Sequence, residues 1–286
     1  MNEQNTSNTR REPDSDAVRR LGSGKPVEDS LSIDAWLSTF AEVGNHGKGL
    51  ARKRSIVGWM AGLSIPAGVV GGIATQEPVV LLLMVAGFLL LGLWGLMGRF
   101  LPKEMVGFLP PLLTLLREEV NPDSKLDLRL DTTGPGKDKL LPELSGTDSL
   151  GRKVKFFKDP WFSGTARLID GAELKWTFTD LIRARTTKHR SASGKTKSKT
   201  KHKVVRTLDI RLRVRAKDYA VDRKTSEAPS GHRISIEESD KRSEIRVRVR
   251  TLPPAVGDPP TIREFVDAVA EAYRRLALHD PERKQP

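Results

Sequence analysis

Two apolar segments, Ser55–Thr75 and Val79–Met97, follow one another and are separated only by the polar tripeptide 76–78. Neither segment contains a charged residue, and each is about 19 to 21 residues long, enough to cross the roughly 30 Å hydrocarbon core of a bilayer as a helix. A helix of that length in a globular core keeps a polar face, and neither segment has one. The sequence therefore predicts a membrane protein with a transmembrane helical hairpin over residues 55–98.

The expected orientation of this hairpin follows from the positions of its flanking cations. Lys48 and the basic triplet 52–54 precede the first span, Arg99 and Lys103 follow the second, and the loop between the spans carries only Glu77. Cations collect on the cytoplasmic side of spanning helices. We expect an integral protein of the inner or plasma membrane with both termini in the cytoplasm and the lipid bilayer as its first partner.

The first span contains two pairs of glycines at a spacing of four residues. Small residues at that spacing let two helix backbones approach closely. We favour packing of the hairpin on itself, and a homo-oligomeric channel or assembly is the alternative. The absence of ionisable residues within both spans argues against a transporter. The predicted helix-packing residues are Gly58, Gly62, Gly68 and Gly72.

The segments that flank the hairpin have distinct compositions. Residues 1–30 are mostly polar, which predicts a disordered tail. Residues 31–54 are expected to form an amphipathic helix and a basic link, with the helix either on the bilayer surface or, as its acidic polar face favours, on the folded domain. Residues 99–122 predict an interfacial Pro/Leu-rich helix that begins at Pro110. The apolar positions of the earlier helix are Ile33, Trp36, Leu37, Phe40 and Val43.

From Lys125 onward the apolar residues recur at every second position, which is typical of half-buried strands. We expect a cytoplasmic β domain over residues 123–253, with Asp170 and Gly171 forming a hairpin turn. Six or seven antiparallel strands are enough for a small sandwich or barrel. The predicted strands cover residues 125–131, 152–157, 164–170, 172–185, 204–216, 232–237 and 243–252.

The last segment, residues 254–286, predicts a helix and a tail. Thr261 and Glu264 have the spacing of a capping box, and apolar residues then follow at helical spacing. Strands closed by one C-terminal helix resemble the pleckstrin-homology order over Lys125–Leu278. The likeness is one of topology alone and implies no site residues. The predicted fold class is an α+β membrane protein, a transmembrane hairpin followed by an antiparallel β sandwich or barrel capped by a C-terminal helix.

The composition excludes several kinds of chemistry. The chain has no cysteine, which removes disulfides, zinc-thiolate sites and thiol catalysis. Its five histidines lack metal-binding spacing. The segment Gly194–Thr196 imitates the end of a phosphate-binding loop but lacks the earlier glycine, since that position is His189. We expect no metal, no cofactor and no catalytic residue, and therefore a protein that is not an enzyme.

The strongest functional candidate is a basic loop over residues 186–203. Between Arg183 and Arg206 there are ten Lys or Arg residues and no Asp or Glu, and the whole chain carries a net charge of +13. We expect the loop to contact anionic lipid headgroups, at about 1 kcal/mol per cation near a membrane, or an acidic protein partner. A nucleic-acid tether is a weaker alternative because no aromatic residues are interleaved for base stacking. The predicted anion-binding residues are Lys188, Arg190, Lys195, Lys197, Lys199, Lys201 and Lys203.

A second basic feature follows two predicted strands. The arginines at 211, 213 and 215 share one strand face, and those at 246, 248 and 250 share another. If the strands are neighbours, six guanidinium groups line one side of a sheet and need acidic partners or an anionic ligand. We favour a solvent-exposed face with cross-strand ion pairs, for which Glu173, Asp209 and Glu237 are candidates.

Overall fold

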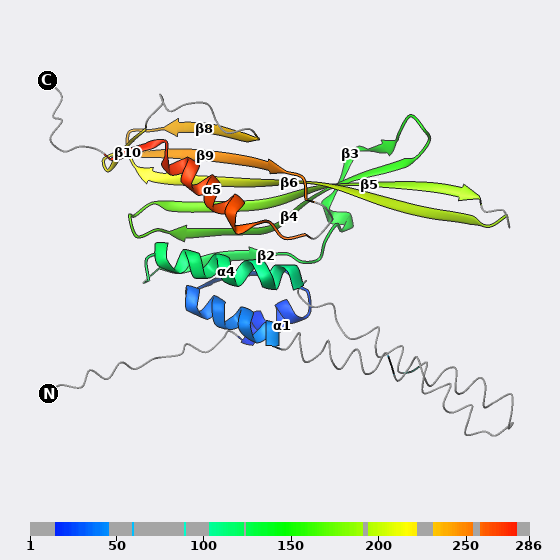
Figure 1. Cartoon of the computed structure of the whole chain (residues 1–286), viewed down its shortest axis with the longest axis horizontal. Helices are drawn as coiled ribbons and strands as arrows, with labels where there is room; N and C mark the ends of the chain where they lie inside the picture. The colour runs from blue at the N-terminus through cyan, green and yellow to red at the C-terminus, as the bar shows by residue number, and fades with distance from the viewer. Residues whose placement is uncertain are drawn as a thin grey trace.

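The computed structural model describes residues 15–45, 59, 89, 103–122, 124–190, 194–221, 231–253 and 258–278. The main element of the described part of the chain is one antiparallel sheet of eight strands, with few helices (Figure 1). The strand order is β1 (Val27–Leu31), β2 (Leu126–Leu130), β4 (Lys153–Arg167), β5 (Glu173–Arg190), β6 (Thr196–Arg215), β9 (Arg242–Thr251) and β8 (His232–Glu238). The remaining strand, β3 (Leu140–Thr147), pairs with β4 off this path.

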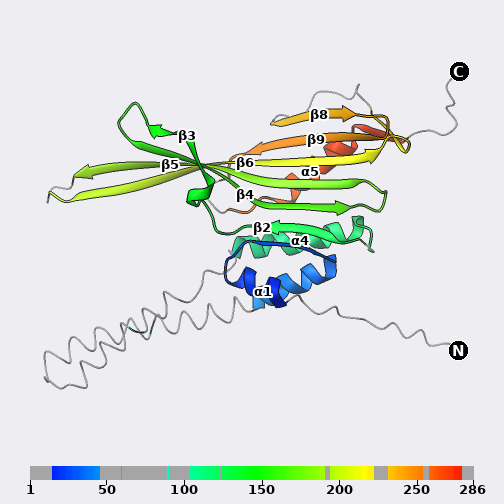
Figure 2. The ribbon, with the colours of Figure 1, turned by 180° about the vertical axis from the view of Figure 1, so that it is seen from behind.

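The helices pack against one face of the sheet. They are α1 (Ser15–Gly22), a helix over residues 33–45, α4 (Lys103–Glu119) and α5 (Ile262–Tyr273). Figure 2 views the molecule from the opposite side to Figure 1, and there α5 lies behind β6 and β9. A short 3-10 helix, η1 (Lys137–Lys139), precedes β3, and β7 (Tyr219–Val221) pairs with β10 (Leu276–Leu278).

The core forms because, outside the outer halves of β5 and β6, most alternate residues of the long strands are apolar and point to the helices. Trp176 and Phe178 of β5 are 1% exposed. Phe178 stacks on Phe162 of β4 with ring centroids 5.8 Å apart, and Trp176 meets Phe265 of α5 edge to face at 5.6 Å. Aromatic pairs in these arrangements add to the stability that burial provides.

The prediction of a transmembrane hairpin is not supported. Among the described residues, no helix is long and apolar enough to cross a membrane. Only Trp59 and Leu89 of the predicted spans are described, and the packing glycines Gly58, Gly62, Gly68 and Gly72 lie outside the described residues. The predicted membrane fold class is therefore corrected to a mainly antiparallel β-sheet with few helices. The predicted integral-membrane localisation is not supported either. The prediction was based on the hydropathy and the flanking charges of the sequence and not on observed packing.

The prediction of a sandwich or barrel in the pleckstrin-homology order is also wrong. The strands form a single open sheet with β1 and β8 at its edges. The α5 helix lies across the apolar face and contacts β6 and β9, so it does not close an end of a barrel. Alternating residues predict which side of a strand is buried, but they do not state whether helices or a second sheet cover that side.

The N-terminal part of the chain is more ordered than its composition predicts. Residues 15–30 were expected to lie in a disordered tail, but they include α1 and all of β1 except its last residue, Leu31. Leu21 and Val27 are each 1% exposed. A few apolar residues at the right spacing are therefore enough to order this segment when they can pack against a core. The amphipathic helix packs on the sheet, as its acidic face indicated, and the Trp36 Nε1 donates a hydrogen bond to the Leu126 carbonyl oxygen at 3.0 Å.

The Pro/Leu-rich helix was expected at a membrane interface, and that prediction is wrong. The α4 helix begins at Lys103 and continues through Pro110 and Pro111. Leu109, Leu112 and Leu113 are completely buried against the sheet. The leucines that were attributed to a lipid interface therefore belong to the core of this domain.

Two local predictions are confirmed. Gly171 has a φ of +83° in the turn that joins β4 to β5, a conformation that costs glycine nothing because it has no Cβ. At the start of α5, the Glu264 backbone N–H donates to the Thr261 hydroxyl oxygen at 3.2 Å, and the Glu264 carboxylate accepts from the Thr261 N–H. Both features depend only on neighbouring residues in the chain.

The core allows no side chain at Gly164 of β4. A Cβ there would collide with the Trp176 ring and lie 2.7 Å from the Leu128 Cδ2. We expect Gly164→Ala to lower the free energy of unfolding by about 1–3 kcal/mol, the usual cost of overpacking. Gly146→Ala in β3, where a Cβ meets nothing within 4 Å, is the control and should stay within about 0.5 kcal/mol. Urea unfolding of both variants measures this, and equal stabilities would contradict it.

Candidate functional site

The basic segment that the sequence predicted as a loop is a two-stranded ribbon. β5 and β6 pair continuously from Arg183 opposite Lys203 to Arg190 opposite Thr196. We call residues 183–190 and 194–203 the arm, and Figure 1 shows it projecting from the rest of the sheet. The prediction of a loop was wrong because alternating Lys and Thr residues lack the apolar positions by which strands are usually recognised.

The register of the arm separates its cations onto two faces, because directly opposed residues of a strand pair point to the same side. One face, which we call the lysine face, holds six cations, whereas Lys188 and Arg190 lie on the other face. Lys195 lies just before β6. Arg183 and Arg185 join the predicted lysines although the sequence analysis did not select them as binding residues. The lysine face consists of Arg183, Arg185, Lys197, Lys199, Lys201 and Lys203.

The lysine face is electrostatically uncompensated. Arg183 lies opposite Lys203, and Arg185 lies opposite Lys201, arrangements in which like charges repel. Among the described residues, no carboxylate forms an ion pair with any of the six cations of this face. The four lysines are exposed and follow each other at about 6.6–6.8 Å along the strand. The face is therefore a regular row of positive charge that is open to solvent.

A buried ion pair lies where the arm meets the sheet. The guanidinium group of Arg206 donates to both carboxylate oxygens of Asp180 at 2.7 and 2.8 Å. The Trp161 Nε1 donates to the same carboxylate at 3.3 Å, and the guanidinium carbon lies 5.3 Å from the Trp161 ring centroid. Two hydrogen bonds and a ring contact fix the geometry of this pair. The pair therefore holds β5 and β6 in a fixed position at the base of the arm.

A second buried cluster supports the same region. The Lys139 ammonium group lies 2.8 Å from Asp131 and 2.7 Å from Asp159. Burial opposes the charge on Lys139, but hydrogen bonds to both carboxylates raise its pKa. Burial raises the pKa of Asp159 despite Lys139, with smaller upward effects from Asp131 and Asp180. The cluster ties η1 to β4 near the start of the arm.

The arginines of β6 and β9 behave differently from those of the arm. The two strands are neighbours, with Arg211 opposite Arg246, so the pairing that the sequence left open exists. Asp209 binds Arg246 and accepts from Arg248 at 3.0 Å, and Arg213 contacts Glu244 at 2.8 Å. The expected solvent-exposed face with cross-strand ion pairs is therefore confirmed for these residues, whose positive charge is partly neutralised.

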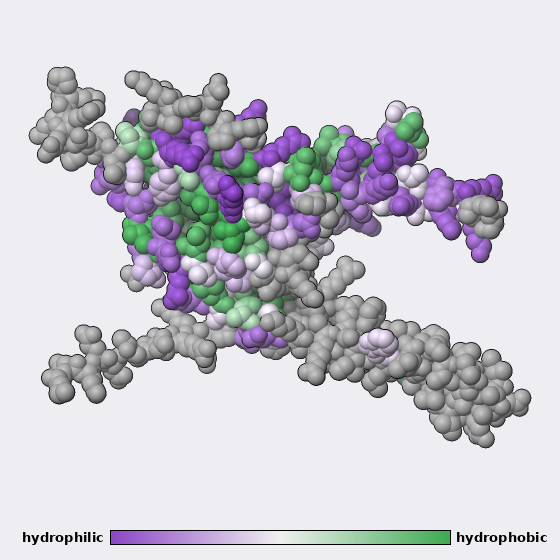
Figure 3. Space-filling view, in the orientation of Figure 1, coloured by the Kyte–Doolittle hydropathy of each residue, from purple (hydrophilic) through white to green (hydrophobic). Residues whose placement is uncertain are grey.

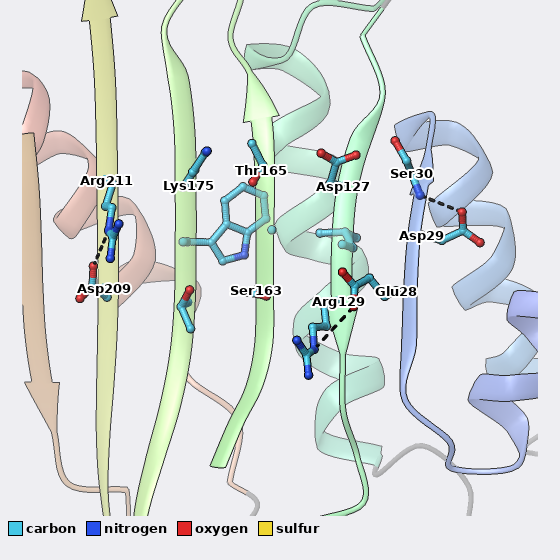
Figure 4. A pocket seen from close by; sticks show the side chains of 14 residues that line it. Glu28, Asp29, Ser30, Asp127, Arg129, Ser163, Thr165, Lys175, Asp209 and Arg211 are labelled. Atoms are coloured by element: carbon cyan, nitrogen blue, oxygen red, sulfur yellow. Dashed lines mark hydrogen bonds and ion pairs between the residues drawn. The ribbon is translucent and has the colours of Figure 1, made fainter. Parts of the chain in front are cut away.

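The surface also has a polar hollow and an apolar cleft. The polar hollow, of about 650 Å³, lies on the helix-free face of the sheet, where Glu28 pairs with Arg129 and Asp209 pairs with Arg211 (Figure 4). The apolar cleft, of about 610 Å³, lies between α4 and α5, within the hydrophobic area of Figure 3. Among the described residues, no group of His, Cys, Asp and Glu side chains could hold a metal ion.

Comparisons of the chain with protein-family models, with curated proteins and with solved structures found no match in any of the three.

The buried pair at the arm predicts a large effect of one substitution. Arg206→Met leaves Asp180 buried without its partner, which should lower the free energy of unfolding by about 3–5 kcal/mol. Arg211→Met serves as the control, because Arg211 is about half exposed and contacts Asp209 at 3.5 Å; its effect should stay within about 1 kcal/mol. Denaturant unfolding at neutral pH compares the two, and similar losses would contradict the assigned role.

The environment of Asp209 predicts a dependence of stability on pH. Burial acts to raise its pKa, but hydrogen bonds from Arg246 and Arg248 outweigh burial and hold the pKa below its usual value. Such a group contributes stability that is complete above the unfolded pKa of about 3.9 and is lost as the pH falls through the folded pKa. We expect Asp209→Asn to cost about 1–3 kcal/mol at pH near 7, and this difference from the wild type should shrink below about pH 4. Urea unfolding across that range measures it, and a difference independent of pH would contradict it.

Proposed function

We propose that this protein is a non-enzymatic interaction module that binds an anionic partner through the lysine face of the arm. The observation that supports this is one strand-pair face with six cations, a row of four lysines on β6 and two arginines on β5, for which no described carboxylate is a partner. The arginines of β6 and β9 show the contrast, because Asp209 and Glu244 neutralise part of their charge. A cationic row maintained against its own repulsion favours an external anion as the missing partner.

The energetics favour a partner that contacts several lysines at once. One exposed ion pair contributes only about 0.2–1 kcal/mol, so a single carboxylate or phosphate would bind weakly. A row of charges along a paired strand can add such contributions without first being ordered. The Asp180–Arg206 pair and the continuous pairing of β5 with β6 hold the row in place, which reduces the entropy cost of binding.

Among the partner classes that the sequence left open, an acidic protein segment is the one we favour. The case for anionic lipid depended on a hairpin that would hold the arm beside a bilayer, and the structure does not support that hairpin. Duplex nucleic acid is a second candidate because the arm is a two-stranded ribbon, an element that the major groove of DNA admits. Binding experiments with an acidic peptide and with duplex DNA distinguish these two classes of partner.

The proposal predicts a loss of binding when the lysine face is neutralised. The test variant of the full-length protein changes Lys197, Lys199, Lys201 and Lys203 to Gln. Its affinity for a peptide of alternating Asp and Thr should fall at least about tenfold, because several ion pairs are lost together, and added salt should weaken wild-type binding. Isothermal titration calorimetry measures both effects. A duplex DNA and phosphatidylserine vesicles are tested in parallel.

A matched pair of double variants separates the lysine face from general positive charge. Lys199→Gln with Lys201→Gln removes two charges from the lysine face. Lys153→Gln with Lys155→Gln removes two from β4, where both side chains are exposed and opposite Thr186 and Ala184. Only the first pair should weaken binding. Equal losses, or unchanged binding by the quadruple variant, would overturn the proposal. Binding of DNA or vesicles but not of the peptide would replace the acidic segment by that class.

A further inference from the structure

Among the described residues, no strand pairs with the outer edge of β6 along the arm. On one side, β5 pairs with β6 as far as Thr196. On the other side, β9 pairs with β6 only from Arg206 to Arg215. Within the described part of the chain, Thr196–Val205 therefore has one paired edge and one open edge. The backbone N–H and C=O groups along an open edge can pair with another extended chain.

We propose that the partner of the arm is an extended acidic polypeptide that adds to the sheet as a strand along the edge Thr196–Val205. Its acidic residues occupy every second position and lie beside Lys197, Lys199 and the two lysines that follow. This inference depends on the proposed function, since it assigns the chemistry and the binding mode of the anion that the lysine face attracts.

The geometry of paired strands accounts for this match. Side chains of an added strand alternate between the two sides with the same repeat as those of β6. Acidic residues at alternate positions therefore stay in register with the lysines over the whole edge. Directly opposed Cβ atoms in paired strands lie about 4.5–5.5 Å apart, within reach of an ion pair between a carboxylate and a lysine. The side chains on the other face of β6 here, Thr196, Ser198, Thr200 and His202, are polar.

Charge also disfavours the pairing of this edge with a second copy of itself. Two such edges would bring lysine beside lysine, and lysines on edge strands are a common protection against aggregation. An acidic strand is attracted by the same lysines. These residues therefore disfavour a second copy of the edge and favour an acidic partner. A nucleic-acid backbone or a lipid headgroup supplies no row of amide N–H and C=O groups to continue the ladder. The requirement for backbone donors therefore distinguishes strand addition from a simple charge contact.

The experiment compares two peptides on the full-length protein by titration calorimetry. One is the peptide of alternating Asp and Thr, and the other has the same sequence with every backbone nitrogen methylated, which keeps the carboxylates and removes the donors. We expect methylation to weaken binding at least about tenfold, because the backbone hydrogen bonds of the added strand are lost. A third peptide of the same composition, with all Asp residues in one block, should also bind less tightly.

The possible results separate the two proposals. Equal binding of the alternating and methylated peptides, with loss in the quadruple Lys→Gln variant, would overturn strand addition and leave anion binding by the lysine face intact. Equal binding of the alternating peptide to wild type and quadruple variant would overturn the proposed function itself. Isotope-edited infrared spectra of a carbon-13-labelled peptide give a second readout. The labelled amide I band should shift to the frequency of paired strands on binding, and an unshifted band would overturn the inference.

Discussion

The ion pair between Asp180 and Arg206 separates the two halves of the longest hairpin in this protein. The two residues lie directly opposite each other on the apolar face of β5 and β6, and their side chains are 6% and 3% exposed. On one side of the pair the same face carries Phe178 and Leu208, which helices cover. Beyond Ile182 and Val204, on the other side, the ribbon becomes the exposed arm. A buried pair of this kind costs desolvation, and here it coincides with the transition from core to arm.

Arginine and lysine have different roles in the two parts of the hairpin. In the sheet, arginines of β6 and β9 share the carboxylates of Asp209 and Glu244, and the forked guanidinium group suits such shared contacts. In the arm, lysines stand at alternate positions of one strand without such partners among the described residues. Lysine is a compact charge on a flexible stem, suited to meeting a partner whose charges are regularly spaced. The contrast between a neutralised face and an uncompensated one supports the assignment of binding to the arm.

Local sequence patterns predicted many elements of the fold. The alternation of Leu126, Leu128 and Leu130 predicted β2, the capping box at Thr261 predicted the start of α5, and the Asp170-Gly171 turn was placed correctly. Each depends on residues that are close in the chain. The helix of residues 33–45 was also recognised, as was its preference for the domain. By contrast, α1 and β1 were missed because Leu21 and Val27 become buried only when α4 and β2 are present.

The largest errors concern the environment of apolar and charged segments. The leucines of α4 suit a lipid interface and a protein core equally well, so hydropathy could not distinguish them. Likewise, the basic segment contains no apolar alternation, and only its pairing with β5 makes it a ribbon with one cationic face. The predicted anion-binding lysines were therefore identified by charge, whereas their division into two faces and the inclusion of Arg183 and Arg185 required the register.

The amino-acid order alone established the excess of positive charge between residues 183 and 206, the absence of thiol chemistry and the positions of most strands, because composition and short-range periodicity encode these directly. The tertiary structure decided that the strands form one open sheet, that Asp209 neutralises part of the arginine face, and that the lysines share one face beside an unpaired edge. These properties arise from contacts between residues far apart in the chain. A strand's periodicity states which of its side chains share a face, but not which strand lies beside it.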